Sequence, residues 1–320
     1  MTVPTPNVYN TPRLLVVGSY CASLTVFSDE LPLRGQTVLG DQVDIGPGGK
    51  GNNQAIAARR LGVDVAFVVK LGRDLFGESA RKLFAREGLV PGEILVGTQG
   101  TGVALIMVDA DGDNMISVGP GANAELELAD VVRFSPAIEG ATHLLCQLEC
   151  TVELFRNVSR WARERGMMTV LNPAPAVPLD DETCRLIDLL TPNETELQIL
   201  TGREVDSDDA AILAARELIE RGVGSVIVTR GARGVIHVTA AQSLLYDAYR
   251  VNARDTTGAG DAFNGGLLAA LTEGDSMESA IDFGMRAAAF CVTRVGVIDG
   301  LASRAQLDAE VPTRSVVSPA

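Results

Sequence analysis

The residues best suited to chemistry gather in the segment from Asp255 to Phe263. Three small residues, Gly258-Ala259-Gly260, stand immediately before a helical pattern of apolar residues that begins at Phe263. The free N–H groups and the dipole of a helix start favour an anion such as phosphate, and glycine lets the backbone approach it closely. An acid at this position, Asp261, would compete with a bound phosphate. Its presence is explained if it takes a proton from an attacking hydroxyl. The alternative is an ordinary first-turn helix acid.

A second glycine-rich segment, Gly46–Gly51, matches the G-x-G-x-x-G pattern of dinucleotide-binding folds. That pattern should follow the first buried strand, which is predicted here to end at Gly18. The chain contains no P-loop pattern of Gly-x-x-x-x-Gly-Lys-Ser/Thr either. We therefore interpret the segment as a floor on which a small polyol approaches the backbone, with Asn53 offering hydrogen bonds and Lys50 a charge. The alternative is a tight turn into a helix.

Composition narrows the range of partners. The chain has 320 residues, of which 46% are hydrophobic, and a formal net charge of −14. Such a charge argues against nucleic acid and anionic membranes as partners, and no apolar run reaches the roughly 18 residues that span a bilayer. Five scattered cysteines indicate reduced thiols and a cytoplasmic protein, and two histidines disfavour a zinc cluster.

Strand and helix patterns alternate along most of the chain, which predicts an α/β fold with a mainly parallel sheet covered on both faces. Ligands of such sheets bind beyond the carboxyl ends of the strands. The predicted strands are 14–17, 65–71, 142–147, 169–172, 188–190 and 225–229. The predicted helices are 51–61, 77–87, 154–165, 194–200, 208–221 and two that start at 258 and 277.

Two stretches, 25–43 and 101–122, break this alternation and are predicted to form antiparallel strands. The second contains Asp111-Gly112, a strong turn signal. They are either plain surface hairpins or, together, a small sheet that acts as a lid. Exposed edges of that lid favour pairing in a homodimer, because unpaired edges are a liability. We expect one domain over 11–310, with loose tails at 1–10 and 311–320.

Taken together, the motifs resemble one family, the ribokinase-like sugar kinases of the PfkB group. The resemblance runs from about residue 14 to 304. It rests on Gly48-Gly49-Lys50-Gly51-Asn52-Asn53-Gln54, Gln147-Leu148-Glu149, Asn172-Pro173-Ala174-Pro175-Ala176, Thr191-Pro192-Asn193-Glu194-Thr195-Glu196, Thr229-Arg230-Gly231-Ala232-Arg233-Gly234 and Gly258-Ala259-Gly260-Asp261.

The resemblance implies a three-layer α/β/α fold with a β-sheet lid, and ATP-dependent phosphorylation of the primary hydroxyl of a pentose or related small sugar or polyol. Asp261 would be the base, and Gly258, Ala259 and Gly260 the anion hole. The implied ATP positions are Asn193, Thr229, Gly231, Gly234 and Gly260. The implied sugar positions are Gly48, Gly49, Lys50, Asn53 and Glu149, together with Cys21, Ser23 and the base.

Two cations are implied as well. Asn193 and Glu196 match an element that positions Mg²⁺, partly through water, and such an ion needs few protein oxygens. The same two residues also fit a helix cap, with Glu196 in the capping-box position. A monovalent cation, expected to be K⁺, would be held mostly by backbone oxygens of Asp255, Thr257, Cys291, Arg294 and Gly296.

The chain departs from the family where the sugar should be held. After the first strand, the family's Asn and Asp are replaced by Cys21 and Ser23, which puts D-ribose in doubt. Gly300 replaces a serine of the cation segment, and Met285 replaces a polar residue near the nucleotide. A nucleoside or another PfkB-type substrate is the alternative for the enzyme. A non-catalytic sugar- or nucleotide-binding regulator is a third reading, against which the intact Asp261, Glu196 and Gly258-to-Gly260 run speak.

Overall fold

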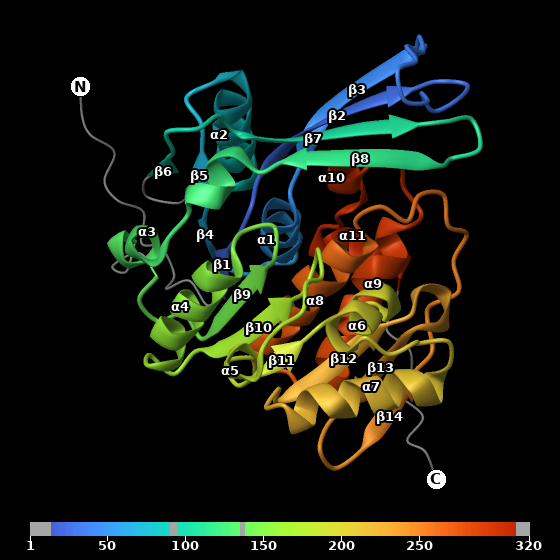
Figure 1. The fold of residues 1–320 in the computed structure, drawn as a ribbon. Helices are drawn as coiled ribbons and strands as arrows, with labels where there is room; N and C mark the ends of the chain where they lie inside the picture. The colour runs from blue at the N-terminus through green and yellow to red at the C-terminus, as the bar shows by residue number, and fades with distance from the viewer. Residues whose placement is uncertain (1–13, 90–94, 135–137, 312–320) are drawn as a thin grey trace.

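A computed structural model describes residues 14–89, 95–134 and 138–311. It has a three-layer body, with a sheet between two layers of helices, and a smaller sheet that projects from the body (Figure 1). The predicted tails lie outside the described residues, apart from Val311. That residue is buried, and its carbonyl accepts a hydrogen bond from Arg286 Nε at 2.6 Å. Within the described part of the chain, no helix has the length and apolarity needed to cross a membrane.

The central sheet confirms the predicted parallel arrangement. In the spatial order given next, the strands from β12 across to β4 are all parallel. The remaining two strands, β13 and β14, add an antiparallel edge that the sequence reasoning did not predict. In spatial order the strands are β14 (Ser243–Tyr246), β13 (Val235–Val238), β12 (Ser225–Thr229), β11 (Leu189–Leu190), β10 (Met168–Asn172), β9 (His143–Gln147), β1 (Leu14–Val17) and β4 (Val65–Val68).

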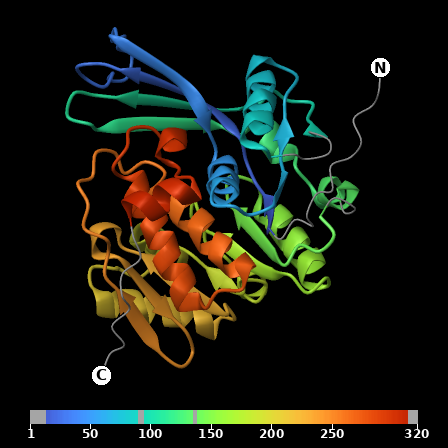
Figure 2. The same ribbon diagram turned by 180° about the vertical axis from the view of Figure 1, so that it is seen from behind.

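Each face of this sheet packs against its own set of helices. In β1, Leu14 and Val16 join one apolar core while Leu15 and Val17 join the other, because successive side chains of a strand point to opposite faces. One layer contains α3 (Leu128–Arg133), α4 (Val152–Arg163), α5 (Asp181–Cys184), α6 (Glu194–Thr201) and α7 (Asp208–Glu220). The other, nearest the viewer in Figure 2, contains α1 (Lys50–Arg60), α2 (Leu75–Glu87), α8 (Ala259–Glu273), α9 (Met277–Cys291), α10 (Val297–Gly300) and α11 (Arg304–Glu310).

The projecting sheet is built from two hairpins, which meet through a parallel pairing of β2 with β7. We call this sheet the lid. Its order is β3 (Gln42–Gly48), β2 (Cys21–Phe27), β7 (Gly102–Val108) and β8 (Asn114–Gly119). The predicted bounds of the first lid segment, 25–43, are wrong at both ends. Strand β2 begins at Cys21 and β3 continues to Gly48, so Cys21, Ser23 and the first half of the glycine-rich segment belong to the lid.

The predicted strand 65–71 is also divided. It breaks after Val68, and β5 (Lys70–Leu71) pairs instead with β6 (Leu95–Val96) in a separate two-stranded sheet. The mostly apolar run does not reveal this change of partner, because β4 is fully buried and Leu71 in β5 is buried as well.

Side chains from the body hold the lid where it joins the body. Asn123, in the 3-10 helix Gly121–Glu125, accepts a hydrogen bond from Tyr20 N at 3.1 Å and donates one to Tyr20 O at 2.8 Å. Asp74 caps α2 through Gly77 N and also accepts hydrogen bonds from Thr101 N at 2.7 Å and Thr101 Oγ1 at 2.8 Å. The beginnings of β2 and β7 are thus tied to the body.

Candidate active site

The site lies beyond the carboxyl ends of the central strands, where α8 begins. Gly258 caps α8 with a left-handed φ of 81°, and a Cβ there would lie 2.7 Å from Val297 Cγ1. Glycine is therefore required by both conformation and space. Gly260 has open space at its Cα and lines two adjoining pockets, of about 430 and about 160 Å³. The backbone N–H groups of the helix start thus lie where the two pockets meet.

Asp261 is buried in the first turn of α8, on the wall of the smaller pocket. Two amides of α1 hold its carboxylate: Asn53 Nδ2 donates to Oδ2 at 2.8 Å, and Gln54 Nε2 donates to Oδ1 at 2.9 Å. Burial raises the pKa of Asp261 above that of an ordinary aspartate, although the Lys50 charge and both amides act in the opposite direction. The group is therefore poised to accept a proton closer to neutral pH.

Lys50, the first residue of α1, lines the same pocket. Burial disfavours its charge, but the carboxylates of Asp261, Glu149 and Glu196 outweigh this effect and raise the pKa of Lys50. The ammonium group is therefore charged at neutral pH. It brings one positive charge to a pocket that otherwise carries acids.

Glu149 follows β9 and contacts the glycine-rich turn. Its Oε2 accepts hydrogen bonds from the backbone N–H of Lys50 at 2.8 Å and from Ser19 Oγ. Gly49 in this turn has a φ of 92°, and a Cβ on it would lie 2.8 Å from Tyr20 Cα. The predicted sugar positions Gly48, Gly49, Lys50 and Glu149 are thus brought together at the junction of lid and body.

Asn193 and Glu196 form a reciprocal helix cap at the start of α6. Asn193 Oδ1 accepts from Glu196 N at 2.8 Å, and Glu196 Oε2 accepts from Asn193 N at 2.9 Å. Burial raises the pKa of Glu196, a shift that the Asn193 hydrogen bond and the Lys50 charge oppose. The capping alternative is therefore confirmed as geometry, yet both residues also line the small pocket with Asp261.

The oxygens of this pocket are of the kind that Mg²⁺ prefers. Within the described ranges, no group of three or more His, Cys, Asp or Glu side chains is placed to hold a metal ion. One carboxylate and one amide oxygen, as Glu196 and Asn193 supply, suit an ion that keeps most of its waters and takes further oxygens from phosphate.

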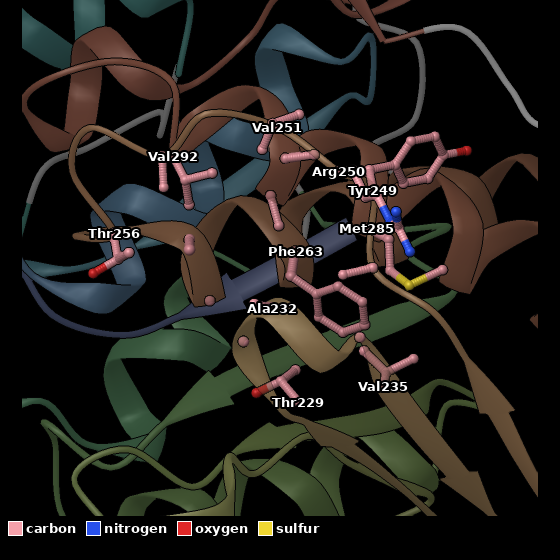
Figure 3. A pocket seen from close by; sticks show the side chains of 18 residues that line it. Thr229, Ala232, Val235, Tyr249, Arg250, Val251, Thr256, Phe263, Met285 and Val292 are labelled. Atoms are coloured by element: carbon pink, nitrogen blue, oxygen red, sulfur yellow. The ribbon is translucent and has the colours of Figure 1, made fainter.

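The larger pocket is lined mainly by apolar side chains, together with Thr229 and glycines (Figure 3). Thr229, Gly231 and Gly234, which are implied ATP positions, line this pocket, and a Cβ on Gly234 would lie only 1.9 Å from Tyr246 O. Sequence reasoning missed most of its apolar wall, for which the only signal was Met285. That wall includes Val235, Ala248, Val251, Phe263, Met285, Ala288, Ala289 and Val292.

Asp255 connects the two segments predicted for the monovalent cation. Its Oδ1 accepts from Thr257 N and its Oδ2 from Gly296 N, both at 2.9 Å. Cys291 Sγ lies 3.6 Å from Thr257 O, so this residue is close as well. The side chain of Arg294 lies over the ring of Phe290 and pairs with Glu310. Any contribution of Arg294 to a cation would therefore come from its backbone.

Cys21 and Ser23 lie on one face of the lid, together with Gly46 and Gly48, because paired residues of neighbouring strands share a face. Cys21 is buried, and burial raises the pKa of its thiol to about 12, so it is neutral. Its Sγ lies 3.5 Å from Asn123 Nδ2. A Cβ on Gly48 would lie 3.7 Å from Ser23 Cβ, which places Ser23 over the glycine-rich turn.

Comparison with known proteins decides the family. The model of the pfkB family of carbohydrate kinases matches residues 11–304. The chain belongs to this family. The expectation of an enzyme, an ATP-dependent carbohydrate kinase, is thereby confirmed.

Individual relatives agree with the family assignment. Ribokinase of Haemophilus influenzae is 40% identical over 91% of this chain and 95% of its own length. Deoxyribokinase of Salmonella typhi is 35% identical over 88% of this chain and 93% of its own.

The structural comparison confirms the fold of this pfkB-family chain. Ribokinase of Thermotoga maritima superposes with a TM-score of 0.84 at 33% identity, covering 93% of this chain and 98% of that one. Ribokinase of Arabidopsis thaliana, solved with ribose and ATP, gives 0.86 at 29% identity with the same coverage.

Proposed function

We propose that the protein transfers the γ-phosphoryl group of ATP to the primary hydroxyl of a pentose or a related small sugar or polyol. The observation that carries the proposal is the position of Asp261. It is a buried acid, held by two amides, on the wall of the small pocket where that pocket joins the larger one at Gly260. A nucleotide in the larger pocket would direct its terminal phosphate at the start of α8, with the acceptor on the Asp261 side.

The residues of the small pocket suit an in-line transfer. Asp261 takes the proton of the attacking hydroxyl as its oxygen bonds to the γ-phosphorus and the bond to the β–γ bridging oxygen breaks, which leaves ADP. The N–H groups of Gly258, Ala259 and Gly260 and the charge of Lys50 stabilise the negative charge on the phosphoryl oxygens. Mg²⁺, when bound through Asn193 and Glu196, supplies further neutralisation of phosphate charge.

Replacing the base tests this mechanism. We expect Asp261→Asn to lower kcat by about 10²–10⁴-fold, the usual contribution of a general base, while ATP still binds. Isothermal titration with a non-hydrolysable ATP analogue and steady-state kinetics measure the two properties separately. Activity within a few-fold of wild type would remove Asp261 from the mechanism.

Potassium activation is a second part of the proposal. Asp255 ties the loop before α8 to Gly296, so a cation bound by the backbone oxygens of these segments would order the start of α8 and strengthen its positive field. Rates in potassium chloride should exceed rates in an equal concentration of tetramethylammonium chloride. Equal rates, with contaminating potassium excluded, would contradict this part.

We further propose that D-ribose is a poor substrate. A carboxylate can accept two hydrogen bonds from a vicinal diol, while Ser23 offers one neutral hydroxyl and Cys21 an apolar thiol. Losing a hydrogen bond to a charged group, worth roughly 1.5–3 kcal/mol against about 1 for a neutral one, weakens ribose on the order of tenfold to a hundredfold. A deoxygenated, differently hydroxylated or bulkier polyol then fits better, and a relative named deoxyribokinase supports the first of these.

A substrate panel decides this part of the proposal. It should contain pentoses, deoxypentoses, tetritols and nucleosides, and the last group tests the alternative of a nucleoside kinase. We expect the double change Cys21→Asn with Ser23→Asp to improve kcat/KM for ribose. If ribose gives the best kcat/KM of the panel in the wild-type protein, the substrate proposal is wrong.

The lid also suggests a homodimer. Val26, Val43, Ile45, Leu105 and Met115 are exposed, and strand pairing places them on the lid face opposite Cys21 and Ser23. A contiguous exposed aliphatic face marks an interaction site. We propose that a second copy of the chain covers it, because a two-fold axis brings the same face of both copies together.

A further inference from the structure

Gln54 is a fully buried amide whose polar atoms all have partners. Its Nε2 donates to Asp261 Oδ1 and to Asn172 Oδ1, both at 2.9 Å, and its Oε1 accepts from Gln147 Nε2 at 2.6 Å. A flipped amide would place its oxygen against two acceptors and its nitrogen against a donor. Asp261 can only accept, and Asn172 uses its Nδ2 on Thr191 O, so these two neighbours fix the direction in which Gln54 presents its hydrogens.

The chain of hydrogen bonds continues to the other side of the α8 start. Asn172 Nδ2 donates to Thr191 O at 2.9 Å, Thr191 Oγ1 donates to Asn264 Oδ1 at 2.7 Å, and Asn264 Nδ2 donates to Gly260 O at 2.9 Å. The chain thus begins at the last residue of β9, crosses the ends of β10 and β11, and returns to the residue that precedes Asp261. Side chains from four separate parts of the sequence converge on one helical turn.

The surroundings of Asp261 show what Gln54 adds. The charged and titratable groups facing Asp261 are Lys50, Glu149, Glu196 and Cys291. Their fields act on the charge of the carboxylate but do not set its orientation. The two amides fix that orientation, one on each oxygen, and Asn53 is itself an implied sugar contact. Of the two amides that donate to Asp261, only Gln54 is not an implied sugar contact.

We propose that Gln54, held by Gln147 and Asn172, is the positioning residue that points the Asp261 carboxylate at the acceptor hydroxyl. The proposal rests on the proposed role of Asp261 as the base. Near-attack geometry places the reacting atoms about 3–3.5 Å apart, so a base that is free to rotate about its side-chain torsions loses part of its effect. A buried polar chain of this kind is costly, and Gln147 Oε1 has no partner among the described residues, so an apolar residue would fill the space of Gln54 with less risk.

A double-mutant cycle tests the proposal, with phosphoryl transfer to the best acceptor of the panel as the assay. We expect Gln54→Met, which keeps the volume and removes the donor, to lower kcat by about tenfold to a hundredfold, equivalent to about 1.4–2.7 kcal/mol. KM for ATP and for the acceptor should stay within about threefold, because neither substrate contacts Gln54 in the proposed mechanism.

The cycle separates positioning from a structural role. If Gln54 acts only through the base, Gln54→Met should change the residual kcat of Asp261→Asn by less than about twofold. A purely structural role would lower kcat in both backgrounds by the same factor. Equal factors in the two backgrounds, or a single change that leaves kcat within twofold of wild type, would overturn the proposal.

Two further variants show whether a loss of activity comes from misfolding. Gln147→Met leaves Gln54 in place and removes the contact on its Oε1; it should give a smaller loss that is likewise absent in the Asp261→Asn background. Ser159→Ala changes a fully buried hydroxyl of α4 outside the site and should keep wild-type kcat. If Asp261→Asn itself retains activity, the proposed base fails. If that variant is inactive while Gln54→Met and Gln147→Met behave as wild type, only the role of Gln54 fails.

Discussion

At the scale of single residues, the buried acid Asp261 and the lysine beside it should determine the acidic side of the pH profile. Burial raises the pKa of Asp261, and a base acts only when it is deprotonated. Activity should therefore be lost as the pH falls through this raised pKa, above the value of about 3.9 for an ordinary aspartate. The profile of log(kcat/KM) against pH measures this limb.

Lys50→Met should move the same limb to higher pH. The Lys50 charge is the largest effect that lowers the pKa of Asp261, so its loss leaves burial less opposed. Lys82→Met, which removes the same charge from an exposed position on α2, serves as the control and should leave the limb in place. A limb that stays fixed in Lys50→Met would show that another group titrates there.

Sequence reasoning assigned residues from several short motifs to one candidate site. The structure places Asp261, Asn53, Lys50, Asn193 and Glu196 on elements that meet, as expected. Sequence reasoning did not assign a role to Gln54, although the residue stands in the quoted glycine-rich motif. The reason is physical: the contact joins residues 207 positions apart, and nothing in the local pattern of α1 reveals it.

At the scale of elements, Asp74 joins α2 to the start of lid strand β7. Asp74→Ala removes an N-cap and two hydrogen bonds to Thr101, so we expect it to lower the free energy of unfolding by about 2–3 kcal/mol. Ser207→Ala, which removes only the cap of α7, should cost about 1 kcal/mol. Urea denaturation of the three proteins gives the comparison, and equal costs for the two variants would show that the tie to Thr101 contributes nothing.

The effect of Asp74 should also depend on pH. Burial acts to raise the pKa of Asp74, but its hydrogen bonds to Thr101 and Gly77 outweigh burial and lower it. A lowered pKa contributes stability above the unfolded value of about 3.9 and loses it as the pH falls through the folded value. The difference between wild type and Asp74→Ala should therefore shrink below about pH 4.

The elements themselves were predictable wherever apolar periodicity was unbroken. The strand at 225–229 has the predicted bounds, and the helix after Gly258 begins one residue later. The lid was harder to delimit, because Gly46-Pro47-Gly48 carries turn residues within strand β3. A strand of that composition is held by its pairing with Cys21–Ser23, which is a tertiary contact.

At the scale of the whole molecule, the aliphatic lid face predicts the oligomeric state. We expect light scattering after size exclusion to give twice the chain mass for the wild-type protein. Leu105→Glu and Ile45→Glu should give the mass of one chain, because a buried unpaired charge opposes association. Leu213→Glu changes an exposed aliphatic residue of α7, away from the lid, and should leave the mass doubled. A monomeric wild-type protein would contradict the proposed pairing.

The position of Cys21 and Ser23 on lid strand β2, apart from Asp261 on α8, bears on how such an enzyme changes in evolution. In the proposed mechanism, the strand that chooses the acceptor is separate from the helix that performs the transfer. Mutations on the strand can then redirect the enzyme to a new metabolite while the reaction itself is preserved. Such an arrangement lets the products of duplicated genes acquire different substrate specificities without first becoming inactive.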